Sequence, residues 1–128
     1  MGVRWLADPP RADLHLLAFG SMVLPALEAA KGERWAVVDV SELPLSSALL
    51  ARLREARTIV TVEEGTTRGG LGAAVLEALG DQPKPPRVKV LGLPGDRILR
   101  HGEARAQRAM LSLDAAGIRR AAHEALGR

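Results

Sequence analysis

The sequence predicts a three-layer α/β/α domain around a sheet of about five mostly parallel strands. Short apolar runs alternate with segments of helical periodicity along the chain. The connections between the runs are too long for hairpins and suit parallel crossovers. The runs are apolar on both faces, so we expect helices to cover both sides of the sheet. The length of 128 residues suits a single domain spanning residues 1–128.

Five segments rich in aliphatic or β-branched residues are expected to be strands. The first is expected at an edge of the sheet and antiparallel to its neighbour. Glu63, Glu64 and Gly65 are expected to end the fourth strand, and Gly92 the fifth. The five segments are Val3–Ala7, Leu14–Phe19, Trp35–Val40, Thr58–Val62 and Val88–Leu91.

Helix boundaries are indicated by capping residues. Ser21 is expected to cap the first helix and Ser46 the second. Gly80 is expected to stop the third helix. The tail from about Ala104 onward is expected to form two helices, the second capped by Asp114.

Composition excludes several classes of function. The chain has no cysteine, which removes disulfides, thiolate chemistry and cysteine-based zinc sites. No apolar stretch approaches the roughly 20 residues of a membrane span, and no export signal is indicated, so we expect a cytoplasmic protein without membrane contact. The arginines of the tail are interrupted by acidic residues and lack interleaved aromatic residues, so nucleic-acid binding is not expected.

Ligands of such sheets usually bind beyond the carboxyl ends of the strands, where Glu63 and Glu64 lie. Adjacent carboxylates could hold a cation or share general acid–base work. However, neighbouring side chains on an extended segment point to opposite faces, so these two need not converge. Capping of the next helix, or pairing with Arg68, is the favoured interpretation.

The segment from Gly65 to Gly72 is a glycine-rich connection from a strand to a helix, with further glycines at Gly69 and Gly70. Exposed N–H groups at a helix start can bind phosphate, and Arg68 could supply positive charge. The sequence matches neither the P-loop nor the dinucleotide fingerprint. The alternative is that the glycines let the helix pack closely on the sheet.

His101 follows the last expected strand. Histidine is the usual proton carrier at neutral pH, but no nucleophile is evident for it to serve. A capping or interface role is therefore favoured for His101. His15 and His123 are expected to be packing or solvated residues.

The order of motifs resembles the C-terminal domain of transketolase-like enzymes, and in particular that of the 1-deoxy-D-xylulose-5-phosphate synthase family. The resemblance covers residues 3–126. The motifs are L-L-A-F-G-S-M-V (16–23), W-A-V-V-D-V (35–40), T-V-E-E-G (61–65), R-G-G-L-G-A-A-V-L-E (68–77), L-G-L-P (91–94) and L-D-A-A-G-I (113–118).

This resemblance implies a part of a larger enzyme. The whole enzyme would condense pyruvate with glyceraldehyde 3-phosphate, using thiamine diphosphate and Mg²⁺, and would supply isoprenoid and thiamine precursors. Two other domains, a thiamine-diphosphate-binding and a pyrimidine-binding domain, would hold the cofactor and the catalytic groups. The domain seen here would pack on them and complete a homodimer, and no catalytic residue maps onto it.

Three functions stay open at this point. The first is an assembly and dimer-interface domain, inactive in isolation, which predicts exposed apolar surface. The second is a stand-alone regulatory module that binds a phosphorylated ligand or a nucleotide at residues 65–72. The third is a small independent enzyme that uses Glu63, Glu64 and His101.

Overall fold

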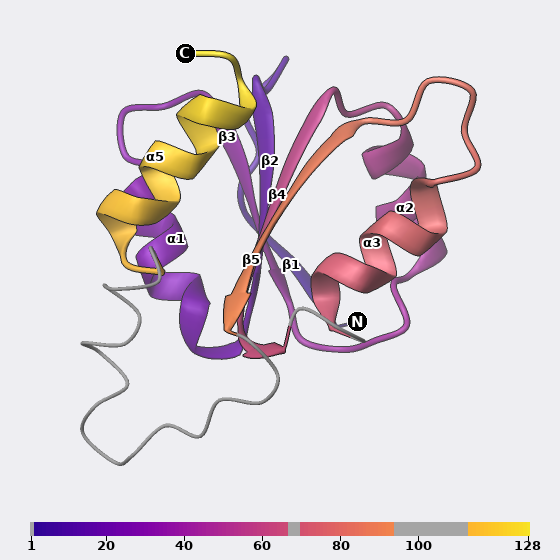
Figure 1. Cartoon of the computed structure of the whole chain (residues 1–128), viewed down its shortest axis with the longest axis horizontal. Coiled ribbons are helices and arrows are strands. Elements are labelled where there is room, and N and C mark those ends of the chain that lie inside the picture. Colours follow the sequence, from indigo (N-terminus) through magenta and orange to yellow (C-terminus); the bar gives the residue numbers. More distant parts are fainter. Residues whose placement is uncertain (1, 67–69, 94–112) are drawn as a thin grey trace.

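The protein folds around one five-stranded sheet, and the computed structural model describes residues 2–66, 70–93 and 113–128. The strands are β1 (Val3–Ala7), β2 (Leu14–Phe19), β3 (Trp35–Val40), β4 (Thr58–Thr66) and β5 (Arg87–Leu93). Their order across the sheet is β1-β3-β2-β4-β5 (Figure 1). β1 is antiparallel to β3, and all other neighbours are parallel. The predicted fold class is therefore confirmed.

Helices cover both faces of the sheet (Figure 1). A 3₁₀ turn, η1 (Gly20–Met22), leads into α1 (Val23–Ala29), which lies beside α5 (Ala115–Ala125) on one face. The other face carries α2 (Ser47–Arg54) and α3 (Leu71–Leu79). The three-layer arrangement follows from strands that are apolar on both sides.

Side chains of the central strand β2 point alternately to the two faces of the sheet and so contribute to both hydrophobic layers. Leu16 and Ala18 pack in the layer under α1 and α5, whereas Leu17 packs in the layer under α2 and α3. All three are fully buried. Neighbouring strand residues point to opposite faces, so a continuous apolar run serves two cores. Burying one such leucine side chain stabilises the fold by about 1.5–3 kcal/mol.

Two helix starts are capped as predicted. The Ser46 hydroxyl accepts a hydrogen bond from the backbone N–H of Leu49 at 3.2 Å, which satisfies a free donor in the first turn of α2. The Asp114 carboxylate accepts the backbone N–H of Gly117 at 2.8 Å at the start of α5. The other tail helix, expected from about Ala104, lies outside the described residues.

The prediction that Ser21 caps the first helix is wrong. Gly20 adopts a left-handed conformation (φ 65°) and the chain turns at once into η1, so Ser21 lies inside a helical turn rather than ahead of it. The N-cap of η1 is Phe19, and no side chain caps it. The Ser21 hydroxyl instead donates a hydrogen bond to Oε2 of Glu64.

The expected ends of two strands are also wrong. β4 continues through Glu63 to Gly65 and reaches Thr66, and β5 continues through Gly92 to Leu93. Thr66 pairs with Leu93, but the register shifts between Val62 and Thr66. A bulge of this kind keeps extended pairing while it re-aims side chains at the strand end.

Within the described ranges, no helix has the length and apolar character that crossing a bilayer requires.

Candidate functional site

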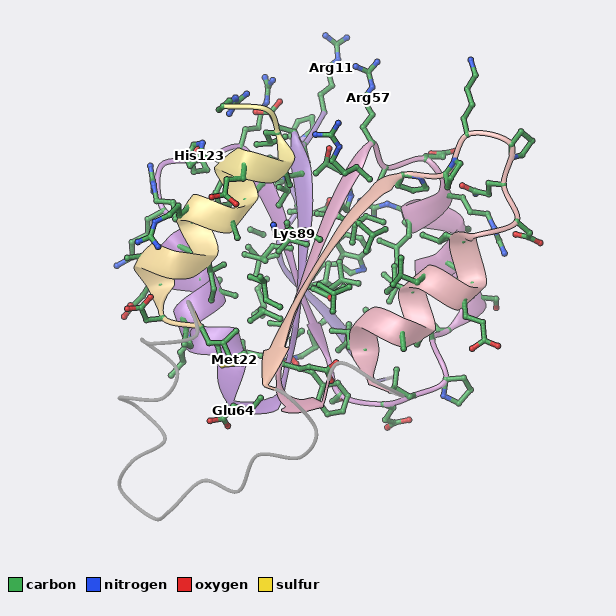
Figure 2. All side chains as sticks on the ribbon, in the orientation of Figure 1. Arg11, Met22, Arg57, Glu64, Lys89 and His123 are labelled. Carbon is green, nitrogen blue, oxygen red and sulfur yellow. The ribbon has the colours of Figure 1, made fainter. Side chains whose placement is uncertain are left out.

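The two carboxylates at the carboxyl end of β4 lie on opposite faces of the sheet. Glu63 points toward α3, where the backbone N–H of Gly72 donates to its Oε1 at 3.4 Å. Glu64, labelled in Figure 2, accepts a hydrogen bond from the hydroxyl of Ser21, which lies in the turn that leads into α1. The backbone alternation of an extended segment produces this divergence. Glu63 and Glu64 therefore do not form a carboxylate pair.

Glu63 is a capping residue of α3. Its side chain is buried, with the residue only 6% exposed, and it lies at the helix start, where the peptide dipoles favour negative charge. The partners available to a buried carboxylate here are backbone N–H groups of the first helical turn. For Glu63, this contact corresponds to capping of the next helix, which is one of the two structural roles expected from the sequence.

Gly70 and Gly72 permit close packing around α3. A Cβ on Gly70 would overlap both carboxylate oxygens of Glu63. A Cβ on Gly72 would press on the side chain of Val90 in β5, with Cγ2 at 2.8 Å, and on Oγ1 of Thr61 in β4, at 3.0 Å. These glycines therefore bring the start of α3 against the sheet, as the packing interpretation of the glycine-rich segment requires.

The remaining predicted site residues are only partly described. Gly65 continues β4. Arg68, Gly69 and His101 lie outside the described residues, so a pairing of Arg68 and a role for His101 stay predictions. Among the described residues, no group of three or more His, Asp or Glu side chains is placed to hold a metal ion.

A groove between α2 and α3 is a feature that sequence reasoning missed. It has a volume of about 320 Å³. Its lining is mainly apolar, with Glu77 as the one charged residue: Pro44, Leu45, Leu50, Ala74, Glu77 and Ala78. The signal in the sequence is the run Leu43-Pro44-Leu45 in a loop, where large apolar residues have no neighbouring strand to cover.

Three large apolar side chains are exposed in the part of the chain that the structure describes. Leu24 on α1 is 72% exposed, Leu76 on α3 is 49% exposed, and Leu43, next to the groove residue Pro44, is 39% exposed. Single exposed leucines are common, but a groove with apolar lining marks surface suited to protein contact.

A cluster of polar side chains links α5 to the connection between α1 and β3. Oε2 of Glu33 forms an ion pair with Nη2 of Arg119 at 2.6 Å and lies 3.1 Å from Nε2 of His123. Nη1 of Arg119 donates to the carbonyls of Ala29 and Lys31 at 3.3 and 3.0 Å, where α1 ends. His123 therefore packs against Glu33, which matches the packing role, one of the two expected for it.

His15 is half-buried in β2, and its ring meets that of Trp5 edge-on at 6.1 Å between centroids. Burial lowers the pKa of His15 below its ordinary value, and the nearby Arg52 lowers it further, while Asp8 acts in the opposite direction. The neutral imidazole is therefore the favoured form at neutral pH.

The fold and the order of the motifs together indicate the family of domains to which this chain belongs. The model of the family described as the transketolase C-terminal domain matches residues 4–118, and the chain belongs to that family.

The particular relatives are synthases. The chain is 45% identical over 122 residues to 1-deoxy-D-xylulose-5-phosphate synthase of Myxococcus xanthus, covering 94% of this chain and 21% of that protein. It is 47% identical over 113 residues to the synthase of Cupriavidus pinatubonensis, covering 87% of this chain and 18% of that protein. The chain spans about a fifth of the length of these relatives. The resemblance found in the sequence is confirmed.

Solved structures agree on the fold. A split-gene transketolase, described as an inactive beta4 tetramer, matches with a TM-score of 0.81 and 31% identity, over 98% of this chain and 42% of that chain. Transketolase from Leishmania mexicana matches with a TM-score of 0.71 and 20% identity, over 99% of this chain and 18% of that chain, which supports the fold alone.

Proposed function

We propose that this domain is the C-terminal assembly domain of a 1-deoxy-D-xylulose-5-phosphate synthase, working in the cytoplasm. The observation that carries the proposal is the match of 94% of this chain to 21% of a synthase. The remainder of such an enzyme, on the same or a partner chain, would hold the catalytic groups. In the proposal, the domain packs on the thiamine-diphosphate-binding and pyrimidine-binding domains and completes a homodimer.

The described residues do not fit the cofactor. Diphosphate bound through Mg²⁺ needs several oxygen ligands around one metal position, and the described residues include no group of three acidic or histidine side chains for it. The glycine-rich start of α3 is occupied by the carboxylate of Glu63, which would repel a diphosphate. Thiamine diphosphate and Mg²⁺ therefore belong, in this proposal, to the other domains.

The apolar groove between α2 and α3 supports contact with a neighbouring domain. Pro44, Leu45 and Leu50 present apolar surface there without a covering element. A neighbouring domain that inserts apolar side chains would bury this surface, which contributes roughly 25 cal/mol per Å² removed from water. We assign the groove to the interface within the enzyme.

Reconstitution tests this function. The Myxococcus xanthus synthase, shortened by the segment that matches this chain, is mixed with the chain and assayed for thiamine-diphosphate-dependent consumption of pyruvate. Light scattering measures the mass of the mixture. We expect no turnover from either part alone, and turnover with a co-migrating complex when both are present.

Paired variants test the groove. Ala74→Glu places a carboxylate in the groove beside Glu77, whereas Ala51→Glu adds the same charge at an exposed position of α2 outside it. We expect about tenfold weaker association for Ala74→Glu and an unchanged affinity for Ala51→Glu. Equal affinities of Ala74→Glu and Ala51→Glu would show that the groove is not part of the interface. Failure of the unaltered chain to restore turnover would contradict the assembly function.

A further inference from the structure

A large open pocket lies at the amino ends of the parallel strands, opposite the end that carries Glu64 (Figure 2). Its volume is about 900 Å³. The loop after β1, the start of β4 and the residues that follow α5 line it, so the pocket joins segments from both ends of the chain.

The pocket is rich in guanidinium groups. Its lining contains five arginines and three carboxylates. Three of the arginines are paired: Arg34 with Asp13 at 2.9 Å, Arg128 with Asp13 at 3.8 Å, and Arg52 with Asp8 at 2.7 Å.

The other two arginines, Arg11 and Arg57, have no carboxylate partner in the part of the chain that the structure describes. Figure 2 shows both side chains extending from this end of the molecule. Two guanidiniums on one pocket, each able to donate in a planar fork, are suited to an anion with several oxygens.

The backbone at Arg11 is an independent observation. Among the described residues, Arg11 is the one non-glycine residue with a positive φ, at 55°. For a residue with a Cβ this conformation costs about 1 kcal/mol or more, and such residues cluster at functional sites. The turn that follows Pro9 and Pro10 thereby holds a long cationic side chain at the rim of the pocket.

Several other residues of the lining suit the non-ionic part of a small molecule. Pro9, Pro10, Ala56 and Leu126 present apolar surface. His15, whose neutral form is favoured by burial, adds an imidazole that can donate or accept a hydrogen bond. A volume of about 900 Å³ is within the range of sites for small organic ligands.

We propose that this pocket binds a small soluble molecule that carries a phosphate or pyrophosphate group, with Arg11 and Arg57 as its charge partners. A dianionic phosphoryl group matches two forked cations better than a single carboxylate does, because it offers more acceptor oxygens and more charge. The site lies at the other end of the sheet from the glycine-rich segment 65–72. It does not depend on the proposed assembly function, since it uses neither the groove nor a partner domain.

Calorimetric titration with inorganic pyrophosphate tests the proposal, at constant ionic strength so that screening is the same in every run. Arg11→Gln combined with Arg57→Gln removes the two charges proposed to bind the anion. Arg54→Gln combined with Arg120→Gln removes two exposed charges outside the pocket and serves as the matched control. We expect one site, about tenfold weakened by the first pair and within about twofold of the unaltered chain in the second.

Two further measurements distinguish a soluble phosphorylated ligand from other anions and from a membrane surface. Citrate reports a general response to multivalent anions, and vesicles of phosphatidylglycerol and phosphatidylcholine report a membrane surface. Weaker binding of citrate and no sedimentation with vesicles support the proposal. No heat with pyrophosphate, equal losses in the two double variants, or vesicle binding that depends on Arg11 and Arg57 would overturn it.

Discussion

The carboxylate of Glu63 occupies the space that a side chain on Gly70 would need. The same carboxylate accepts the backbone N–H of Gly72. The glycine and the buried acid are thus two parts of one arrangement at the start of α3, in which a capping carboxylate reaches the helix because nothing projects from Gly70.

Gly70→Ala is expected to destabilise the fold by about 1–2 kcal/mol, because the new methyl group displaces Glu63 from its capping position. Urea denaturation measures the change. In a Glu63→Ala background the same substitution should cost much less, since the clash has gone. Full additivity of the two changes would show that Gly70 and Glu63 are not coupled.

Gly72→Ala is expected to destabilise the fold by about 1–3 kcal/mol, because its methyl group overpacks the contact with Val90 and Thr61. Thermal unfolding with circular dichroism measures it. Glu77→Ala, at an exposed position on the same helix, is the control and should change stability by less than about 0.5 kcal/mol. A neutral Gly72→Ala would mean that α3 does not depend on close approach to the sheet.

Arg119→Ala is expected to lower the free energy of unfolding by about 1 kcal/mol, because it removes donors to the carbonyls of Ala29 and Lys31 and the ion pair with Glu33. Chemical denaturation compares it with Arg120→Ala, the neighbouring exposed arginine, which should be near neutral. Arg119→Lys should recover only part of the loss, since an ammonium cannot reproduce the planar fork. Equal effects at positions 119 and 120 would contradict the capping role.

His15 is expected to make stability depend on pH. Its pKa in the folded protein is lowered from the ordinary value of 6.5, mainly by burial. The unfolded chain therefore takes up the proton first as the pH falls. The stability contributed by the neutral folded form is complete above about pH 6.5 and is lost as the pH falls toward the lowered pKa.

The measurement is the free energy of unfolding at about pH 8 and about pH 5.5. His15→Gln should reduce the loss between these two values relative to the unaltered chain. An unchanged loss in His15→Gln would assign the pH dependence to other groups.

Local sequence determines the strands and several helix boundaries. Continuous apolar runs predict β2 and β3 at their observed bounds, and the caps at Ser46 and Asp114 bond as expected. These features are local, because a capping side chain satisfies an N–H only three residues away. The order of motifs likewise indicates the family, since those short segments recur with the fold. The prediction of Ser21 as an N-cap was wrong because a 3₁₀ turn that begins at Gly20 shifted the start of the helix.

Only the tertiary structure determines which of the candidate charged side chains lie close together. Residues Glu63 and Glu64 are adjacent in sequence yet serve opposite faces, while Arg11, Arg57 and Arg128 share one pocket across most of the chain length. The groove between α2 and α3 likewise depends on how two helices pack. The sequence determined the elements, because hydrophobic periodicity and capping are properties of neighbouring residues. The positions of the charged groups depend on strand pairing and helix packing, which bring distant residues together only in the folded chain.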